Sequence, residues 1–313
     1  MKTVSPQYYN EFRCIADKCV HNCCIGWEID IDEQTLSKYS LLGGKLASKL
    51  KDCICKNSGD AHFILDDDDR CPFLCEDGLC ELIKEAGDDL LCDICNEHPR
   101  YHNYYSDRVE SGIGLCCEEA ARIIVCHSGK ISLADNGASE SCNEIERLFF
   151  ERRQNIFDII QDANSSIDEK LHILERRFSF KCPSLSMQEC ANILLHFEHL
   201  DTNWPKLLRA LKSSHCDFAA QPLTSKWNNA LSNLCHYFIF RHLPCDADES
   251  EFCAVICYAF FSLKVILALT MCNSDFSIDT LIEIARMYSA EVEYSDENYD
   301  SLIDLLKGCK YEQ

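Results

Sequence analysis

The sequence predicts a mainly α-helical protein with a loop-rich, cysteine-rich metal-cluster region at its N-terminal end, followed by an all-α helical bundle. The first observation is the distribution of the 24 cysteines, most of which lie before residue 128. The second is the apolar pattern after residue 141, which repeats with a helical period and rarely alternates as in a strand. We therefore expect a cysteine-rich metal-binding domain at 1–127, a connecting segment at 128–141 and a helical domain at 142–313.

The N-terminal region is predicted to consist of short helices and turns. Helical patterns cover 32–50 and 118–125, and the turn-forming stretches "KNSGDA" and "LDDDDRCPF" lie between them. The stretch "HSGKISLADNGASES" is rich in Gly, Ser, Asn and Asp, which is typical of a connecting segment. This region does not visibly contain the apolar residues of an independent core.

The helical region begins with the stretch "CNEIERLFFERRQNIFDIIQD". Its apolar residues fall on one stripe of a helix, namely Ile145, Leu148, Phe149, Ile156, Ile159 and Ile160. Similar patterns predict further helices at 167–178, 187–200, 204–213, 226–242, 251–271, 278–290 and 296–306. The cysteines of this region lack the spacing of metal ligands, so we expect them to pack as small apolar residues.

Charge and hydropathy restrict the classes of protein to which the chain can belong. The net charge of −22 argues against binding to nucleic acid and suits a basic partner, although an acidic surface also keeps a protein soluble. Residues 252–272 are long and apolar enough to span a membrane, but Lys264 near their middle favours a buried core helix. The start of the chain lacks the apolar stretch of a signal peptide. We expect a cytoplasmic protein with no membrane contact, whose thiols are kept reduced.

The spacing of the N-terminal cysteines predicts metal binding. They read C-x4-C-x3-C-C and then C-x8-C-x11-C-x2-C, followed by one more cysteine: Cys14, Cys19, Cys23, Cys24, Cys71, Cys80, Cys92, Cys95 and Cys117. Thiolates are soft ligands that suit zinc or iron–sulfur clusters, and the metal would contribute folding energy. Only Cys92 and Cys95 form a C-x2-C pair, and the adjacent Cys23 and Cys24 fit poorly into one zinc tetrahedron. Spacing alone leaves both metals open.

Three segments carry a resemblance to a known family. The stretches "YNEFRCIADKCVHNCCIGWEIDID", "CPFLCEDGLCELIKEAGDDLLCDICNEHPRY" and "GLCCEEAARIIV" resemble those of the flagellin lysine N-methylases (FliB), which contain a YkgJ-type cysteine cluster. The resemblance implies a cytoplasmic enzyme with a [4Fe-4S] cluster that transfers a methyl group from S-adenosylmethionine to lysines of flagellin. It also implies that the helical domain recognises the substrate. Cys53, Cys55, Cys75, Cys116 and Cys126 fall outside the family pattern, and Glu118 stands where a proline is expected.

The site for the methyl donor has no familiar motif. The sequence has neither the G-x-G-x-x-G turn of a doubly wound methyltransferase nor the C-x3-C-x2-C triplet of radical enzymes that use S-adenosylmethionine. Arg100 is a candidate to hold the donor's carboxylate, with a structural salt bridge as the alternative. We expect Trp27 to pack beside the cluster. Tyr101, Tyr104 and Tyr105 are candidates to line the reacting site, and packing in an aromatic core explains them equally well.

The alternative to an enzyme is a non-catalytic zinc or iron–sulfur binding protein that acts as a metal carrier or redox sensor. Without the family resemblance, the residues alone do not separate these two functions.

Overall fold

The computed structural model describes residues 1–56, 60–137, 142–214 and 223–307. The chain forms two compact units. One comprises Arg13–Tyr101, and the other comprises Met1–Phe12 together with His102–Gln313. We call them the cysteine-rich unit and the helical unit. The cysteine-rich unit is thus an insertion in the helical unit, and residues 102–127, which the sequence analysis grouped with the cysteines, belong to the helical unit.

The described residues of the cysteine-rich unit form four short α-helices: α1 (Glu33–Leu41), α2 (Gly44–Asp52), α3 (Glu81–Ala86) and α4 (Asp93–Glu97). The helix predicted at 32–50 is divided in two, because Gly43 and Gly44 interrupt it and Gly44 has a φ of +81°. The Asp32 carboxylate caps α1 by accepting a hydrogen bond from the Thr35 N–H at 2.8 Å. Its second oxygen accepts from the Asp93 N–H at 2.9 Å, which joins the start of α1 to the start of α4.

This unit has a hydrophobic core of its own, which corrects the expectation from the sequence. The rings of Phe63 and Phe73 lie 5.1 Å apart, and Tyr39 packs on Phe63 at 6.4 Å. The core also contains Ile29, Ile31, Leu50, Leu82 and Leu90. These residues come from short segments far apart in the chain, so no single stretch of sequence shows the apolar periodicity of a core element.

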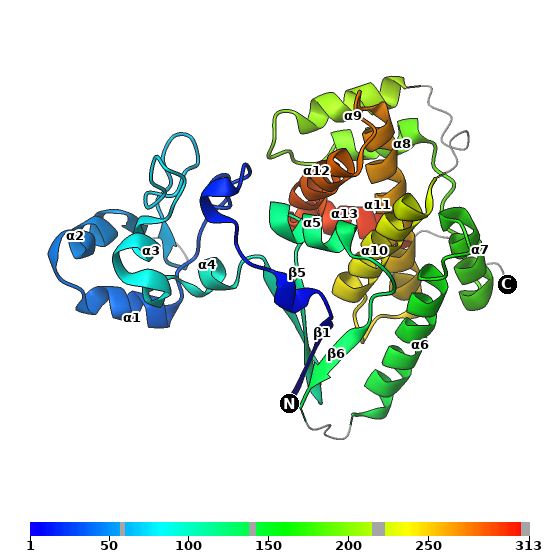
Figure 1. The fold of residues 1–313 in the computed structure, drawn as a ribbon, viewed down its shortest axis with the longest axis horizontal. Coiled ribbons are helices and arrows are strands. Elements are labelled where there is room, and N and C mark those ends of the chain that lie inside the picture. Colours follow the sequence, from blue (N-terminus) through cyan, green and yellow to red (C-terminus); the bar gives the residue numbers. More distant parts are fainter. Residues whose placement is uncertain (57–59, 138–141, 215–222, 308–313) are drawn as a thin grey trace. The chain divides into compact units, whose positions relative to one another are not determined.

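The helical unit contains a four-stranded sheet that the sequence analysis did not predict. Its order is β4 (Arg100–Tyr104), β5 (Arg108–Ile113), β1 (Lys2–Pro6) and β6 (Leu133–Asn136), with β1 parallel to β5 and antiparallel to β6 (Figure 1). The strand β6 lies within the predicted connecting segment. It escaped prediction because it is short and polar, and only its pairing with the distant β1 makes it a strand.

The predicted helices are confirmed with small shifts at their ends. They are α5 (Glu118–Cys126), α6 (Glu144–Ile160), α7 (Ile167–Phe178), α8 (Met187–Leu195), α9 (Trp204–Ser213), α10 (Ser225–His242), α11 (Glu249–Cys272), α12 (Ile278–Tyr288) and α13 (Asp296–Lys307). Between α12 and α13 the chain forms a π-helical turn, η4 (Ser289–Glu293). The mainly α fold class is therefore confirmed.

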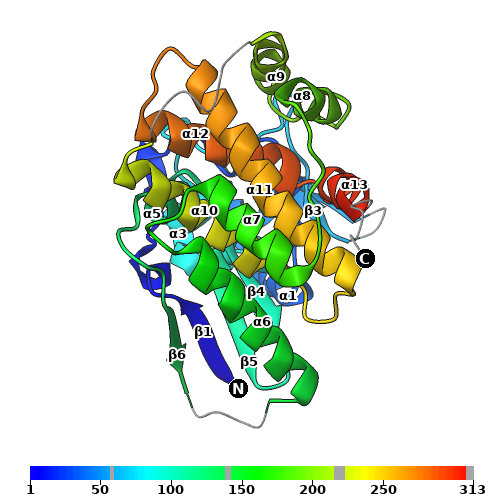
Figure 2. The same cartoon turned by 90° about the vertical axis from the view of Figure 1, so that its right-hand side faces the viewer.

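The helix α11 lies at the centre of the helical unit and packs against α10, α12 and α13 (Figure 2). It is long and apolar enough to span a membrane, but 89% of its most apolar window is buried inside the protein. Lys264 is 45% exposed and lies 4.0 Å from the Asp168 carboxylate. The prediction of a buried core helix is confirmed, because the unit itself covers the apolar surface of α11.

Two expectations about side chains in the helical unit are wrong. Ile145 and Leu148 were assigned to the buried stripe of α6 but are 70% and 48% exposed, because the stripe that meets the core begins at Phe149. Cys182 and Cys257 form a disulfide across 75 residues instead of packing as separate thiols. Their separation in sequence gave no signal of the pairing.

Candidate metal centre and a buried polar network

Five of the predicted metal ligands lie in or against the core of the cysteine-rich unit: Cys24, Cys71, Cys80, Cys92 and Cys95. Short helices position three of them. Cys80 and Cys92 immediately precede α3 and α4, and Cys95 follows Cys92 by about one helical turn. The backbone positions the other two, because the Cys71 N–H donates a hydrogen bond to the Cys24 carbonyl at 2.8 Å.

The thiols interact with one another across this core. Cys23 hydrogen-bonds with Cys24 through its side chain, and Cys92 does the same with Cys95. Cys24 also interacts electrostatically with Cys71 and Cys80, and Cys95 interacts with Cys24 and Cys71. The structure therefore gathers six predicted ligands, from four separate segments, into one group that we call the thiol cluster: Cys23, Cys24, Cys71, Cys80, Cys92 and Cys95.

Crowding and burial oppose negative charge on these sulfur atoms. Burial, with smaller contributions from the neighbouring thiols Cys80 and Cys92, raises the pKa of Cys71 to about 11, against a hydrogen bond from the Phe73 backbone. Within the pair of Cys23 and Cys24, the hydrogen bond from Cys24 lowers the pKa of Cys23 to about 7, whereas the pKa of Cys24 is raised. Several thiolates can coexist in this space only if a cation neutralises them.

Backbone N–H groups point at several of the sulfur atoms. Burial raises the pKa of Cys80, and hydrogen bonds from the backbone of Leu82 and Ile83 oppose this increase. Hydrogen bonds from the side chain and, to a smaller extent, from the backbone of Cys95 lower the pKa of Cys92. Such donors stabilise thiolates and tune iron–sulfur clusters. The donor set of the thiol cluster therefore fits a soft metal or an iron–sulfur cluster.

The spacing of the sulfur atoms bears on the choice between zinc and an iron–sulfur cluster. Among the described residues, the sets of three ligand atoms within 4.8 Å of one another are Glu28, Asp30 and His62, and Asp107, Cys142 and Glu146. No such set consists of three cysteines. In a zinc tetrahedron with Zn–S bonds of about 2.3 Å, the sulfur atoms lie roughly 3.8 Å apart. The thiol cluster is thus more open than a single zinc site.

The other three predicted ligands lie outside the thiol cluster. Cys14 is exposed, and its sulfur accepts a hydrogen bond from the Ala16 N–H at 3.4 Å. Cys19 is half-buried, and its thiol donates to the His21 carbonyl at 3.2 Å. Cys117 belongs to the helical unit, where it immediately precedes α5.

Sequence reasoning missed a seventh cysteine near the thiol cluster. Cys53 packs against the same hydrophobic core and interacts electrostatically with Cys71. A signal for its position was available, since Leu46, Leu50 and Cys53 follow the i, i+4, i+7 spacing of one helix face. Cys53 stands directly after α2, so it continues the buried face of that helix.

Trp27 lies beside the thiol cluster. Its indole N–H donates a hydrogen bond to the Cys23 carbonyl at 2.6 Å, and its ring meets His98 edge to face at 5.1 Å. Burial lowers the pKa of His98 to about 4, so this ring is neutral at pH 7. Arg100, the candidate for binding the donor's carboxylate, is half-buried at the first position of β4.

The three candidate tyrosines occupy different environments. Tyr104 is 73% exposed at the end of β4. Tyr105 is buried in the helical unit, where it packs on Phe149 and Phe150 with ring centroids 6.0 and 5.0 Å away. Tyr101 belongs to the cysteine-rich unit and is half-buried. The contacts of Tyr105 are those of an aromatic core, the alternative that the sequence left open.

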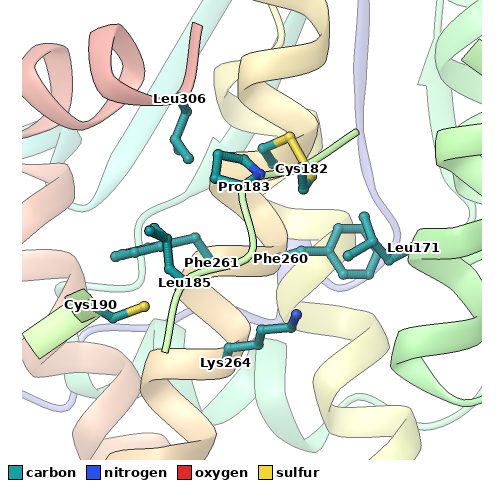
Figure 3. A pocket seen from close by; sticks show the side chains of 10 residues that line it. Leu171, Cys182, Pro183, Leu185, Cys190, Phe260, Phe261, Lys264 and Leu306 are labelled. Carbon is teal, nitrogen blue, oxygen red and sulfur yellow. A yellow bond between two sulfur atoms is a disulfide. The ribbon is translucent and has the colours of Figure 1, made fainter. Parts of the chain in front are cut away.

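The described residues of the helical unit line at least two cavities. The smaller has a volume of about 30 Å³ beside the Cys182–Cys257 disulfide, and Cys190, Phe260 and Lys264 contribute to its lining (Figure 3). It has room for about one water molecule and excludes a cofactor. The larger has a volume of about 580 Å³ where α5 ends and α10 begins, and its lining includes His127 and Lys226. That volume is in the range of small-molecule sites.

The helical unit also contains a buried polar network that sequence reasoning missed. The Glu293 carboxylate is fully buried and lies 3.1 Å from the Arg241 Nε. It accepts hydrogen bonds from the Tyr237 hydroxyl at 2.6 Å and the Ser289 hydroxyl at 2.5 Å, and His242 Nε2 lies 2.6 Å away. Although burial opposes the charge, Arg241 and these partners lower the pKa of Glu293 to about 2. In the sequence, Glu293 stands among other acidic residues and looks like part of a solvated surface.

These features define a mainly α-helical protein in which a unit with a cluster of thiols is inserted into a helical host. The family model described as "FliB lysine N-methylase C-terminal domain" matches residues 112–313, which is more than half of the chain and lies within the helical unit. The chain therefore belongs to the FliB lysine N-methylase family, as its cysteine pattern suggested.

Individual relatives agree with this family. The chain is 28% identical to "Lysine-N-methylase" of Salmonella typhimurium over 187 residues, which make up 54% of this chain and 45% of that protein. It is 29% identical to "Flagellar biosynthetic protein FliU" of Salmonella muenchen over 161 residues, which make up 47% of this chain and 90% of that protein. The match thus spans about half the length of the lysine-N-methylase. No solved structure matches the chain.

Proposed function

We propose that this protein is a cytoplasmic enzyme that methylates lysine side chains of flagellin with S-adenosylmethionine as the methyl donor. The observation that carries the proposal is the family match over residues 112–313, together with relatives named for lysine methylation and for flagellar biosynthesis. The net charge of −22 suits a substrate that presents a cationic lysine.

The reaction requires a neutral amine. The lysine nitrogen attacks the methyl carbon, the bond between that carbon and the sulfonium sulfur breaks with its electrons passing to sulfur, and one proton leaves the nitrogen. An unperturbed lysine has a pKa of about 10.4, so roughly one amine in 2500 is neutral at pH 7. The acidic surface would attract the cationic side chain, but the reacting site itself must favour the neutral amine by burial or by a base.

We further propose that the thiol cluster holds a [4Fe-4S] cluster, with zinc as the alternative. Support comes from the buried sulfur atoms, from the N–H groups that point at Cys71, Cys80 and Cys92, and from sulfur spacings wider than one zinc ion uses. When bound, such a cluster supplies folding energy and a Lewis-acidic iron. The chain's own part is to present the thiolates and, through Trp27, to cover the backbone beside Cys23.

The proposal is tested with the full chain purified under anaerobic conditions. We expect a brown protein that contains iron and sulfide and that transfers labelled methyl groups from S-adenosylmethionine to lysines of purified flagellin. A colourless protein that contains zinc would contradict the iron–sulfur part. Absence of transfer by a protein with its full metal content would contradict the enzymatic part.

One observation favours a second function, that of a non-catalytic metal carrier or redox sensor. The thiol cluster lies wholly within residues 13–101, whereas the family model matches 112–313. This second function would be supported if the protein binds iron stoichiometrically but methylates no lysine. A metal carrier would release the iron to an acceptor protein, and a redox sensor would release it on oxidation.

A further inference from the structure

A short extended segment of the cysteine-rich unit, 28–31, runs antiparallel to the strand β3 (His62–Phe63). The Phe63 N–H donates a hydrogen bond to the Ile29 carbonyl at 3.1 Å, and this register places Asp30 opposite His62. Side chains alternate between the two faces of paired strands. The two segments therefore present their residues in turn to the core and to the outside.

The inner and outer faces of this strand pair differ in character. The side chains of the inner face are buried in the hydrophobic core of the unit, and they belong to Ile29, Ile31 and Phe63. The outer face carries three residues that each offer one ligand atom within 4.8 Å of the other two: Glu28, Asp30 and His62. Groups that bind divalent metal ions thus converge from two segments that are far apart in the sequence.

The backbone orients the imidazole ring of His62. Its Nδ1 lies 3.1 Å from the Asp60 carbonyl oxygen, which can only accept a hydrogen bond, so Nδ1 carries the hydrogen. In the neutral ring, Nε2 then has a lone pair to offer, and it lies 3.7 Å from Glu28 Oε2. A histidine that binds metal through one ring nitrogen commonly donates to a backbone carbonyl through the other.

The distance from His62 Nε2 to Glu28 Oε2 fits two ligands of one metal ion. At 3.7 Å it is longer than a hydrogen bond, for which the range is about 2.7–3.2 Å. With bonds of about 2.0–2.1 Å from zinc to nitrogen and oxygen, the ligand atoms of a tetrahedron lie roughly 3.3 Å apart. A small movement of exposed side chains would therefore complete the coordination.

The second set of convergent ligand atoms in the described part of the chain is less suited to a metal. Asp107 accepts hydrogen bonds from Arg108 through both carboxylate oxygens, at 2.8 and 3.1 Å. Glu146 accepts from the N–H of Ser106 at 2.8 Å and also from its hydroxyl. A metal would have to displace these donors, whereas the carboxylates of the first set are exposed to water.

We infer that Glu28, Asp30 and His62 bind one divalent transition-metal ion at a site separate from the thiol cluster. Imidazole suits zinc and iron, and carboxylates suit manganese, so the ligand set is harder than a set of thiolates. Three protein ligands leave coordination positions on the exposed side for water or for an anionic group. The bound ion links the segment 28–31 to β3. The inference goes beyond the proposed function, because none of the three residues belongs to the thiol cluster.

The test uses the full chain purified under anaerobic conditions, with Mn²⁺ as the probe because manganese binds thiolates poorly. Electron paramagnetic resonance measures free Mn²⁺ during a titration in the presence of excess Mg²⁺, which displaces cations held only by the acidic surface. The test variants are His62→Ala and Glu28→Gln. The matched controls are His172→Ala, whose Nδ1 lies 3.1 Å from a glutamate in the helical unit, and Glu144→Gln, whose side chain is 82% exposed.

We expect the unchanged protein and both controls to bind one Mn²⁺ ion, and the two test variants to bind it about tenfold more weakly or worse. Absence of binding, binding that Mg²⁺ abolishes, or equal affinity in test and control variants would overturn the inference. The last two results would show that the acidic surface alone holds the ion.

A second measurement needs no substitution. Diethyl pyrocarbonate modifies accessible imidazole nitrogens, and mass spectrometry locates the modified residues in the unchanged protein. Mn²⁺ should slow the modification of His62 roughly threefold or more, because the metal occupies Nε2, and it should leave His172 unaffected. Modification of His62 at the same rate with and without Mn²⁺ would overturn the inference.

Discussion

Arg153 on α6 and Glu110 on β5 form a buried ion pair, with Arg153 Nη2 lying 2.6 Å from Glu110 Oε1 and side chains that are 2% and 0% exposed. Rings surround the guanidinium group, with the centroids of Phe149, Phe157 and Phe240 between 5.0 and 5.5 Å away. Glu110 Oε2 and Arg153 Nη1 have no hydrogen-bond partner among the described residues. The pair therefore joins helix to sheet through a single hydrogen bond in an aromatic environment.

This geometry makes the pair sensitive to the loss of one partner. Glu110→Leu leaves a buried, unpaired guanidinium group and should lower the free energy of unfolding by about 3–5 kcal/mol. The double variant Glu110→Leu with Arg153→Met should recover most of the loss, because it removes both charges and their incomplete hydrogen bonding. Chemical denaturation of the single and double variants measures the coupling. Additive losses in the double variant would contradict this account.

The thiol cluster predicts which cysteines are needed for metal. Cys95→Ser and Cys71→Ser should lower bound metal and destabilise the cysteine-rich unit by several kcal/mol, because a structural site contributes folding energy directly. Cys235→Ser, a buried cysteine on α10, is the control and should leave the metal content unchanged. Elemental analysis and hydrogen exchange of residues 13–101 provide the measurements. Equal loss of metal in all three variants would exclude the thiol cluster as the binding site.

Cys53 requires a separate expectation. It lies against the core but outside the spacing pattern, so Cys53→Ser should destabilise the unit modestly, by about 1–2 kcal/mol, because it places a hydroxyl group in a partly buried position. The variant Cys53→Ser should bind as much metal as the unchanged protein. If Cys53→Ser loses metal as Cys95→Ser does, Cys53 is itself a ligand.

His236 makes the stability of the helical unit depend on pH. Burial, with smaller effects of Arg153 and His127, lowers its pKa to about 3, and its ring stacks on Phe157 at 4.0 Å. The folded protein therefore binds this proton less readily than the unfolded chain, whose histidine pKa is about 6.5. The associated stability is fully present above pH 6.5 and is lost as the pH falls toward 3. At pH 5 the loss is about 2 kcal/mol.

His236→Phe tests this dependence, because it keeps the stacked ring and removes the titrating group. It also removes two ring nitrogens that have no hydrogen-bond partner among the described residues. The variant should be more stable than the unchanged protein, and the difference should grow between pH 7 and pH 5 in denaturation experiments. A difference that stays constant with pH would show that His236 does not titrate as described.

The Cys182–Cys257 disulfide connects the segment between α7 and α8 to α11. Closing a loop across 75 residues should stabilise the helical unit by about 4 kcal/mol through the unfolded state. Reduction by a dithiol should therefore lower the free energy of unfolding, and Cys182→Ser should remove the response to the dithiol. If the dithiol lowers the free energy of unfolding of Cys182→Ser as much as that of the unchanged protein, the bond that it reduces is not Cys182–Cys257.

Local signals in the sequence predicted the helices, and the features they missed depend on distant contacts. Ser166 and Glu169 form a capping box at the start of α7, and such a pattern is visible in the sequence itself. By contrast, β6 is a strand because it pairs with β1. Glu293 is a buried anion because it forms an ion pair with Arg241. Neither partner lies near in sequence. Six of the nine cysteines that the spacing singled out lie together in the thiol cluster, whereas Cys14, Cys19 and Cys117 lie outside it and the position of Cys53 depends on the core of the unit.

The insertion of the cysteine-rich unit between Phe12 and His102 has a consequence for synthesis. On the ribosome, β1 is made before the cysteine-rich unit, but β5, with which it pairs, is made only after that unit is complete. The inserted unit can therefore fold, and take up the metal proposed for it, while its host is still without a sheet and without the helices that follow. If the thiol cluster holds iron as proposed, its maturation would precede assembly of the helical unit, and a shortage of iron during translation would act on the inserted unit first.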